Sequence, residues 1–181
     1  MTRSMFQVLF LVAAAALSAG CSTAPRSSAD RAELHADVLS TIATFKAADP
    51  SILAFFDNAK GYAVFPSIGK GGIGIGGAYG RGELFEGGEV VGHCDMSQAT
   101  IGFQLGGQVY SEIVFFETPA TLGEFKTGNV EFSAQASAVA ATAGAAAKAD
   151  YDSGVAVFIH STGGLMYEAS IGGQKFSYAP K

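Results

Sequence analysis

The chain has 181 residues, of which 49% are hydrophobic and 15% are charged. This composition is too apolar for a disordered chain, and the length suits a single domain with a buried core. The formal net charge of −5 at pH 7 argues against a nucleic-acid partner and against simple electrostatic adhesion to anionic lipid, although a local basic spot stays open.

The N-terminal residues 1–20 have the pattern of a secretory signal peptide: one positive charge, Arg3, then an apolar run that ends in small residues. The run ends in LSAGC, which resembles a bacterial lipobox, in which the cysteine, here Cys21, is lipidated and becomes the first mature residue. Ser18 departs from that pattern, which usually has Leu there, so a plainly secreted protein is the alternative. By the same resemblance, Ser22 suits an outer-membrane lipoprotein that faces the periplasm and carries an acyl group such as palmitate.

The residues after the signal peptide are mostly small and polar. We therefore expect a short lipidated tether over 21–29 and one domain over 30–181. With Cys21 acylated, Cys94 is the only other thiol, so we expect no internal disulfide. Cys94 is then expected to be a buried small hydrophobic residue.

Three helices are predicted. The first covers 30–49, where apolar residues recur at helical spacing and Asp30 begins a capping-box pattern. It should stop before Pro50, which opens a second, short helix capped by Asp49. The third covers 118–128, where a threonine cap precedes proline and a glycine ends the helix.

From Gly61 onward apolar residues alternate with polar residues or glycine, which predicts strands. The predicted strands are GYAVFP, GGIGIGGAYG, GELFE, EVVGHCDM, ATIGFQLGG, VYSEIVFFE, GVAVFIH, GLMYEA and SIGGQKFSY. The alanine-rich segment 130–142 is ambiguous between helix and strand, and we favour a strand because Ser and Ala alternate at its start. The predicted fold class is α+β: a strongly curved, mostly antiparallel and even barrel-like sheet, with the N-terminal helices packed on it.

The glycine-rich stretch KGGIGIGGAYGRGEL contains Gly72, Gly74 and Gly77 in the spacing of a dinucleotide-binding loop. Such a loop follows a strand and opens a helix, but the glycines that come next disfavour a helix, so we expect no nucleotide. Gly72, Gly74 and Gly76 instead occupy one face of a strand, with isoleucines on the other. Either a helix or strand of the protein or an acyl chain could approach the backbone closely at this bare face.

Three cations border the glycine-rich region: Lys60, Lys70 and Arg81. They are either solvated charges at strand ends or, together with Gly72, Gly74 and Gly76, the contact site for a small anion or a lipid headgroup. His93 and Asp95 could share one face of a strand, but with Cys94 on the other face they make neither a metal site nor a nucleophile. We find no catalytic motif, no carboxylate pair and no metal-ligand spacing, and expect no enzyme and no cofactor.

The segment AKGYAVFPSIGKGGIGIGGAYGRGEL resembles the opening of the SYLF domain. This family occurs in bacterial exported proteins and in eukaryotic membrane-trafficking and actin-patch proteins. TIGFQLGGQVYSEIVFF and FSAQASAVAA resemble its second and third segments, so the resemblance covers about residues 30–178. Glu83 departs from the apolar residue that is usual at its position, which makes this strand edge more polar and argues against a uniform lipid-facing surface there.

The resemblance implies lipid binding, including phosphoinositides in eukaryotic members, and actin binding in some fungal ones. Actin is implausible for an exported bacterial lipoprotein. We therefore expect a non-enzymatic lipid-binding lipoprotein of the cell envelope, with membrane lipids as its partners. The alternative is a structural or protein-interaction module of the envelope, with an unknown protein partner and no lipid ligand.

Overall fold

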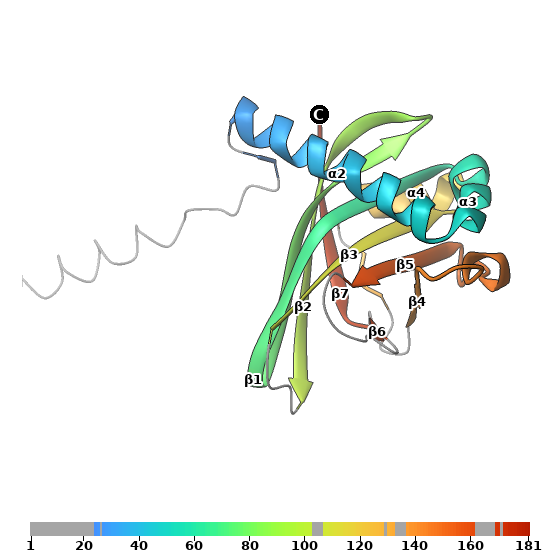
Figure 1. Ribbon diagram of the computed structural model, residues 1–181. Helices are drawn as coiled ribbons and strands as arrows, with labels where there is room; N and C mark the ends of the chain where they lie inside the picture. The colour runs from blue at the N-terminus through green and yellow to red at the C-terminus, as the bar shows by residue number, and fades with distance from the viewer. Residues whose placement is uncertain are drawn as a thin grey trace, which may run out of the picture.

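The computed structural model describes residues 24–25, 27–102, 107–128, 130–132, 137–161, 169–170 and 172–181, so the expected signal peptide and Cys21 lie outside the described residues. Helices at the N-terminus pack on a curved sheet (Figure 1). The elements in chain order are α2 (Ser28–Ala48), η1 (Pro50–Ile52), α3 (Leu53–Asn58), β1 (Gly61–Glu86), β2 (Glu89–Gly102), β3 (Gly107–Phe116), α4 (Pro119–Lys126), β4 (Ser137–Ala140), η2 (Ala146–Lys148), β5 (Val155–Ser161), β6 (Ala169–Ser170) and β7 (Gln174–Pro180).

The first helix begins earlier than the sequence pattern predicted. Ser27, not Asp30, is its N-cap, because the Ser27 side chain accepts the N–H of Asp30 at 3.0 Å. Asp30 then lies in the first turn, where a carboxylate interacts favourably with the helix dipole. The helix ends before Pro50, and Asp49 caps the 3-10 turn that leads into α3, as predicted.

The third predicted helix is confirmed as α4. Thr118 accepts the N–H of Thr121, and the Thr121 hydroxyl accepts the N–H of Thr118, which makes a capping box with Pro119 at the first helical position. None of the described helices is by itself long and apolar enough to cross a membrane. The segments Ser28–Ala48 and Pro50–Asn58 are long and apolar enough only when they are taken together, and the chain bends by 115° between them.

The glycine-rich region forms one continuous strand, β1, where the sequence pattern predicted three. Its first half pairs with β3 and its second half with β2. β1 curves so strongly that its halves touch: a Cβ on Gly82 would lie 2.2 Å from the carbonyl oxygen of Val64, and one on Gly61 would lie 2.7 Å from that of Phe85. Only glycine permits this approach, because real Cβ atoms do not come so close to backbone oxygens.

The sheet has seven strands in the order β6-β4-β5-β3-β1-β2-β7. All neighbouring pairs are antiparallel except β4 with β5. The α+β class and the mostly antiparallel sheet are confirmed, but the sheet is open rather than a closed barrel. The expected strand over 130–142 is only partly present: Glu131 bridges to Lys175 of β7 and β4 pairs with β5, while residues 133–136 lie outside the described part.

Each face of the sheet carries its own hydrophobic core. The interior face, covered at one end by α4, is filled by aromatic and aliphatic side chains of the protein itself, including Phe65, Phe116, Phe125, Phe176, Leu84 and Met96. The helix face packs against α2 and α3 through Val38, Phe45, Phe55, Val64, Phe115 and Phe158. Cys94 is fully buried on the interior face, as predicted.

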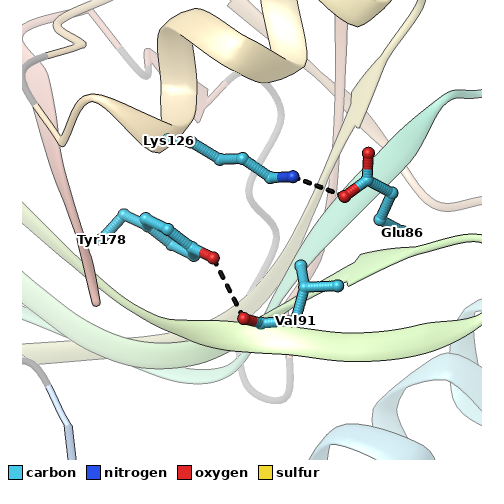
Figure 2. A network of polar contacts seen from close by, with 4 residues as sticks. All are labelled: Glu86, Val91, Lys126 and Tyr178. Atoms are coloured by element: carbon cyan, nitrogen blue, oxygen red, sulfur yellow. Dashed lines mark hydrogen bonds and ion pairs between the residues drawn. The ribbon is translucent and has the colours of Figure 1, made fainter. Parts of the chain in front are cut away.

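An ion pair and a hydrogen bond attach α4 and β7 to the β1–β2 hairpin (Figure 2). The ammonium group of Lys126, at the end of α4, pairs with the carboxylate of Glu86, at the end of β1. The hydroxyl of Tyr178 on β7 donates a hydrogen bond of 3.0 Å to the backbone oxygen of Val91 on β2. These contacts hold the last strand and α4 against the hairpin end that lies farthest from the glycine run.

Candidate functional site

The glycine run lies in an arm of the sheet that extends away from the helices (Figure 1). We call this the distal arm and define it as residues 69–80 of β1, 96–102 of β2 and 107–110 of β3. Within it β1 changes partner, since Gly71 pairs with Gly107 of β3 and Gly74 pairs with Gly102 of β2. The run therefore sits inside a strand, and the helix that a dinucleotide-binding loop requires does not follow it.

The distal arm is almost uncharged. Lys70 is its only charged residue, whereas the whole chain has 11 basic and 16 acidic residues. Two of its larger side chains are exposed to solvent, Tyr79 at 47% and Val109 at 50%. On the interior face, a Cβ on Gly80 would lie 2.6 Å from the Ile68 side chain, so the protein itself covers the strand at Gly80. What lies against the bare face predicted at Gly72, Gly74 and Gly76 stays a prediction.

The predicted cations do not converge on one point. Lys60 is exposed beside the end of β3, where its N–H donates to the Phe116 oxygen at 2.8 Å. Lys70 is half-buried at the other end of the β1–β3 ladder, opposite Gln108. Arg81 lies at the base of the distal arm. Lys70 is therefore the cation on the arm, and Arg81 belongs to a different group of charges.

Arg81 is one corner of a group that we call the charged square: Arg81, Glu83, His93 and Asp95. In the β1–β2 ladder Arg81 is opposite Asp95 and Glu83 is opposite His93, so the four side chains share one face. The Arg81 Nε atom lies 3.9 Å from Asp95 Oδ1 and donates to the Tyr79 hydroxyl at 3.1 Å. As predicted from alternation, His93 and Asp95 lie on the face opposite to Cys94.

The N-terminal half of α2 contacts the charged square at Glu83. His35 on this helix places its Nδ1 atom 2.7 Å from Glu83 Oε2, and Glu83 is only 3% exposed. The sequence suggested that Glu83 makes the edge of this strand more polar. In the structure Glu83 is instead buried and is the partner of a helix side chain. The C-terminal half of α2 docks through apolar residues instead, among them Val38 and Phe45.

His93 is a buried member of the charged square. Burial lowers its pKa, and the positive charges of Arg31 and Lys181 act in the same direction, against the opposing effect of Glu83. Its Nδ1 atom has no hydrogen-bond partner among the described residues. No group of three or more His, Cys, Asp or Glu side chains in the described part of the chain could hold a metal ion. The arrangement attaches α2 to the β1–β2 hairpin through the contact of His35 with Glu83.

A second polar group lies inside the sheet and was missed by sequence analysis. Glu112 on β3 and Gln174 on β7 are both fully buried, and the Gln174 Nε2 atom donates to Glu112 Oε2 at 2.9 Å. The Tyr110 hydroxyl lies 3.4 Å from the same nitrogen. Burial raises the pKa of Glu112 to about 7 and also raises the pKa of Tyr110. The only signal in the sequence is a glutamate within the apolar run VYSEIVFF.

Helices packed on an open, mostly antiparallel sheet place the protein in the α+β class. Residues 97–179 match the model of the Ysc84 family, which is described as Las17-binding protein actin regulator. This match confirms the resemblance to the Ysc84 (SYLF) family over residues 97–179, while the glycine-rich segment that opens the resemblance lies before the matched range. The chain is also 30% identical over 136 residues to Beta cell expansion factor A of Aeromonas veronii. The alignment covers 70% of this chain and 49% of the relative, so the chain spans about half the length of that protein.

Proposed function

We propose that this protein is a non-enzymatic, lipid-binding lipoprotein of the bacterial cell envelope, anchored through Cys21, and that its distal arm contacts membrane lipid. The supporting observation is the composition of that arm, in which Lys70 is the only charge. A surface with few charges loses little hydration free energy when it leaves water, so it can enter the headgroup region of a bilayer at low cost.

The exposed side chains of the arm suit such a contact. Val109 offers apolar surface, and Tyr79 combines an apolar ring with a hydroxyl, as aromatic residues at membrane interfaces do. Lys70 can lay its aliphatic stem along the arm and direct its ammonium group to a lipid phosphate. With glycine at most other positions of β1 in this region, the backbone itself can approach the lipid.

The proposed contact is on the surface of the sheet rather than inside it. The interior face is filled by the protein's own side chains, and Gly80 and Gly82 approach the backbone of the first half of β1. An acyl chain would have to displace these packed groups. We therefore place the lipid headgroups and the upper parts of their chains against the distal arm.

Co-sedimentation with liposomes of phosphatidylethanolamine and phosphatidylglycerol tests this proposal. A truncated chain from residue 22 onward, which lacks the anchor, should bind, and Val109→Asp should weaken its binding several-fold. Leu39→Asp is the matched control, because Leu39 is equally exposed, at 49%, but lies on α2. Failure of the unchanged chain to bind any bacterial lipid mixture, or an equal loss in both variants, would refute lipid contact through the arm.

The alternative is an interaction module of the cell envelope that has no lipid ligand. The filled interior face favours it, since such a module needs no internal room for a ligand. In that case the distal arm would be a protein-binding surface. The truncated chain that lacks Cys21 would then not bind liposomes, while Val109→Asp would still abolish cross-linking from the arm to an envelope protein.

A further inference from the structure

Two buried acceptor atoms in the acid–amide pair of Glu112 and Gln174 lack a donor. The bond from Gln174 Nε2 to Glu112 Oε2 uses one polar atom of each side chain. The remaining atoms, Glu112 Oε1 and Gln174 Oε1, have no hydrogen-bond partner among the described residues. An unsatisfied buried polar atom costs about 1–3 kcal/mol, so two in one contact call for an explanation.

We propose that Glu112 is a proton-binding site inside the sheet: in mildly acidic solution it is a carboxylic acid in the folded protein, and the proton on Oε1 is donated to Gln174 Oε1. An acid and a primary amide can form two hydrogen bonds at once, since each group has one donor and one acceptor. The existing N–H bond to Oε2 is the first of these, and the proton supplies the second. One proton therefore satisfies both orphaned atoms.

The surroundings of the pair favour the neutral acid. Glu112 and Gln174 have no exposed surface, and their neighbours on the interior face include Ile68 of β1 and Ile159 of β5. An ionised carboxylate would lose its hydration there without a cation in exchange. Burial accordingly raises the pKa of Glu112 to about 7, against the smaller opposing effect of the bond from Gln174.

Other titratable groups that face the interior do not compete for this role. Among the described residues they are Tyr110 on β3 beside the pair, Cys94 on β2 and Tyr178 on β7, and burial raises the pKa of each one, so all three stay neutral between pH 5 and 8. β1, β5 and α4 contribute apolar side chains such as Ile68, Ile159 and Phe125. The ion pair of Glu131 with Lys175 lies on exposed side chains near β7.

The proton affects the stability of the sheet, because the acid–amide pair that it completes joins two strands that are not neighbours. β1 and β2 separate β3 from β7 in the sheet, so the acid–amide pair bridges the curved interior. Loss of the proton removes one of its hydrogen bonds and leaves a buried charge. The folded protein holds this proton up to about pH 7, whereas the carboxyl group of an unfolded chain releases it near 4.5. Stability from this group therefore falls as the pH rises through that interval.

Infrared spectroscopy and urea unfolding of the full chain test the proposal. The wild type should show the band of a protonated carboxylic acid that disappears with a midpoint near pH 7, and Glu112→Gln should lack it. Glu112→Gln should also be more stable than the wild type at pH 8, because its amide donates to Gln174 without a charge. Glu131→Gln is the control, and should keep the band and the urea midpoint.

The exchanged pair Glu112→Gln with Gln174→Glu keeps one acid facing one amide and should restore the band. An acid band that persists in Glu112→Gln would overturn the proposal. So would a wild-type carboxyl that titrates near 4.5, which would instead indicate an ionised Glu112 bridged by water. The spectrum of the wild type decides the question even if a variant fails to fold.

Discussion

The Asp49 carboxylate accepts a hydrogen bond of 2.7 Å from the N–H of Ala146, which lies 97 positions further along the chain. Its other oxygen accepts the N–H of Gly144 at 3.0 Å, together with the N–H and the hydroxyl of Ser51. One buried side chain therefore caps η1 and also holds the turn that leads into η2. This contact joins the N-terminal helices to the segment between β4 and β5.

Asp49→Asn should destabilise the protein. Burial alone would raise the pKa of Asp49, but the hydrogen bonds from Ala146, Ser51 and Gly144 outweigh it and lower the pKa from 3.8 to about 2. The stabilisation is therefore complete above pH 3.8 and is lost as the pH falls toward 2. We expect a loss of about 2 kcal/mol at pH 7, measured by urea unfolding. Asp57→Asn, on the exposed side of α3, should change stability by less than about 0.5 kcal/mol; equal effects of the two substitutions would contradict this assignment.

Glu83→Gln should loosen the N-terminal half of α2. The substitution removes the charge that pairs with His35 and leaves a buried amide beside His93. A loss of about 1–3 kcal/mol is expected, with faster amide hydrogen exchange in the first turns of α2. The control is Glu86→Gln in the same strand, whose carboxylate is 46% exposed and pairs with Lys126. That exposed pair should contribute at most about 1 kcal/mol. Unchanged hydrogen exchange in α2 of the Glu83 variant would count against attachment of α2 through Glu83.

His93 should make the protein sensitive to mild acid. Burial lowers the pKa of His93 in the folded state below the ordinary value of 6.5 for a histidine. The unfolded chain therefore takes up a proton first as the pH falls below 6.5, and stability decreases in that range. His93→Asn should flatten this part of the profile of urea midpoint against pH. A profile of the variant parallel to that of the wild type between pH 7 and 5 would show that His93 does not titrate on unfolding.

Gly82→Ala should be among the most damaging small substitutions in the chain. Its Cβ would lie 2.2 Å from the Val64 oxygen, and both partners are backbone in the same curved strand. Overpacking of this kind costs about 1–3 kcal/mol or more, since neither group can rotate away. Gly69→Ala in the same strand is the control, because its Cβ would meet nothing within 4 Å. Similar thermal midpoints for the two variants would show that β1 does not fold back on itself in this way.

The local elements were predictable because their signals are local. Thr118 and Pro119 mark the start of α4, and the alternation around Gly74 marks a strand, whatever the rest of the chain does. The continuity of β1 was not predictable, because the glycines that look like strand breaks are needed where Gly80 and Gly82 meet residues 64–68. That requirement arises only from the curvature of the folded sheet.

The polar contacts were predictable in part. Alternation placed His93 and Asp95 together on one face, but the burial of Glu83 depends on where α2 crosses the hairpin. The pair of Glu112 and Gln174 joins strands that are 62 positions apart in the sequence. Neither residue has a spacing motif, and only the three-dimensional arrangement brings them together.

The depth of the distal arm in a lipid bilayer tests the proposed function most directly. An environment-sensitive fluorophore attached at Val109→Cys in the truncated chain from residue 22 onward should shift to shorter wavelength when bacterial-lipid liposomes are added. It should also be quenched by a quencher carried on the acyl chains. The same fluorophore at Leu39→Cys, on α2, should respond to neither. If the fluorophore at position 109 stays in water, or responds no more than the one at position 39, the distal arm is not a membrane-binding surface.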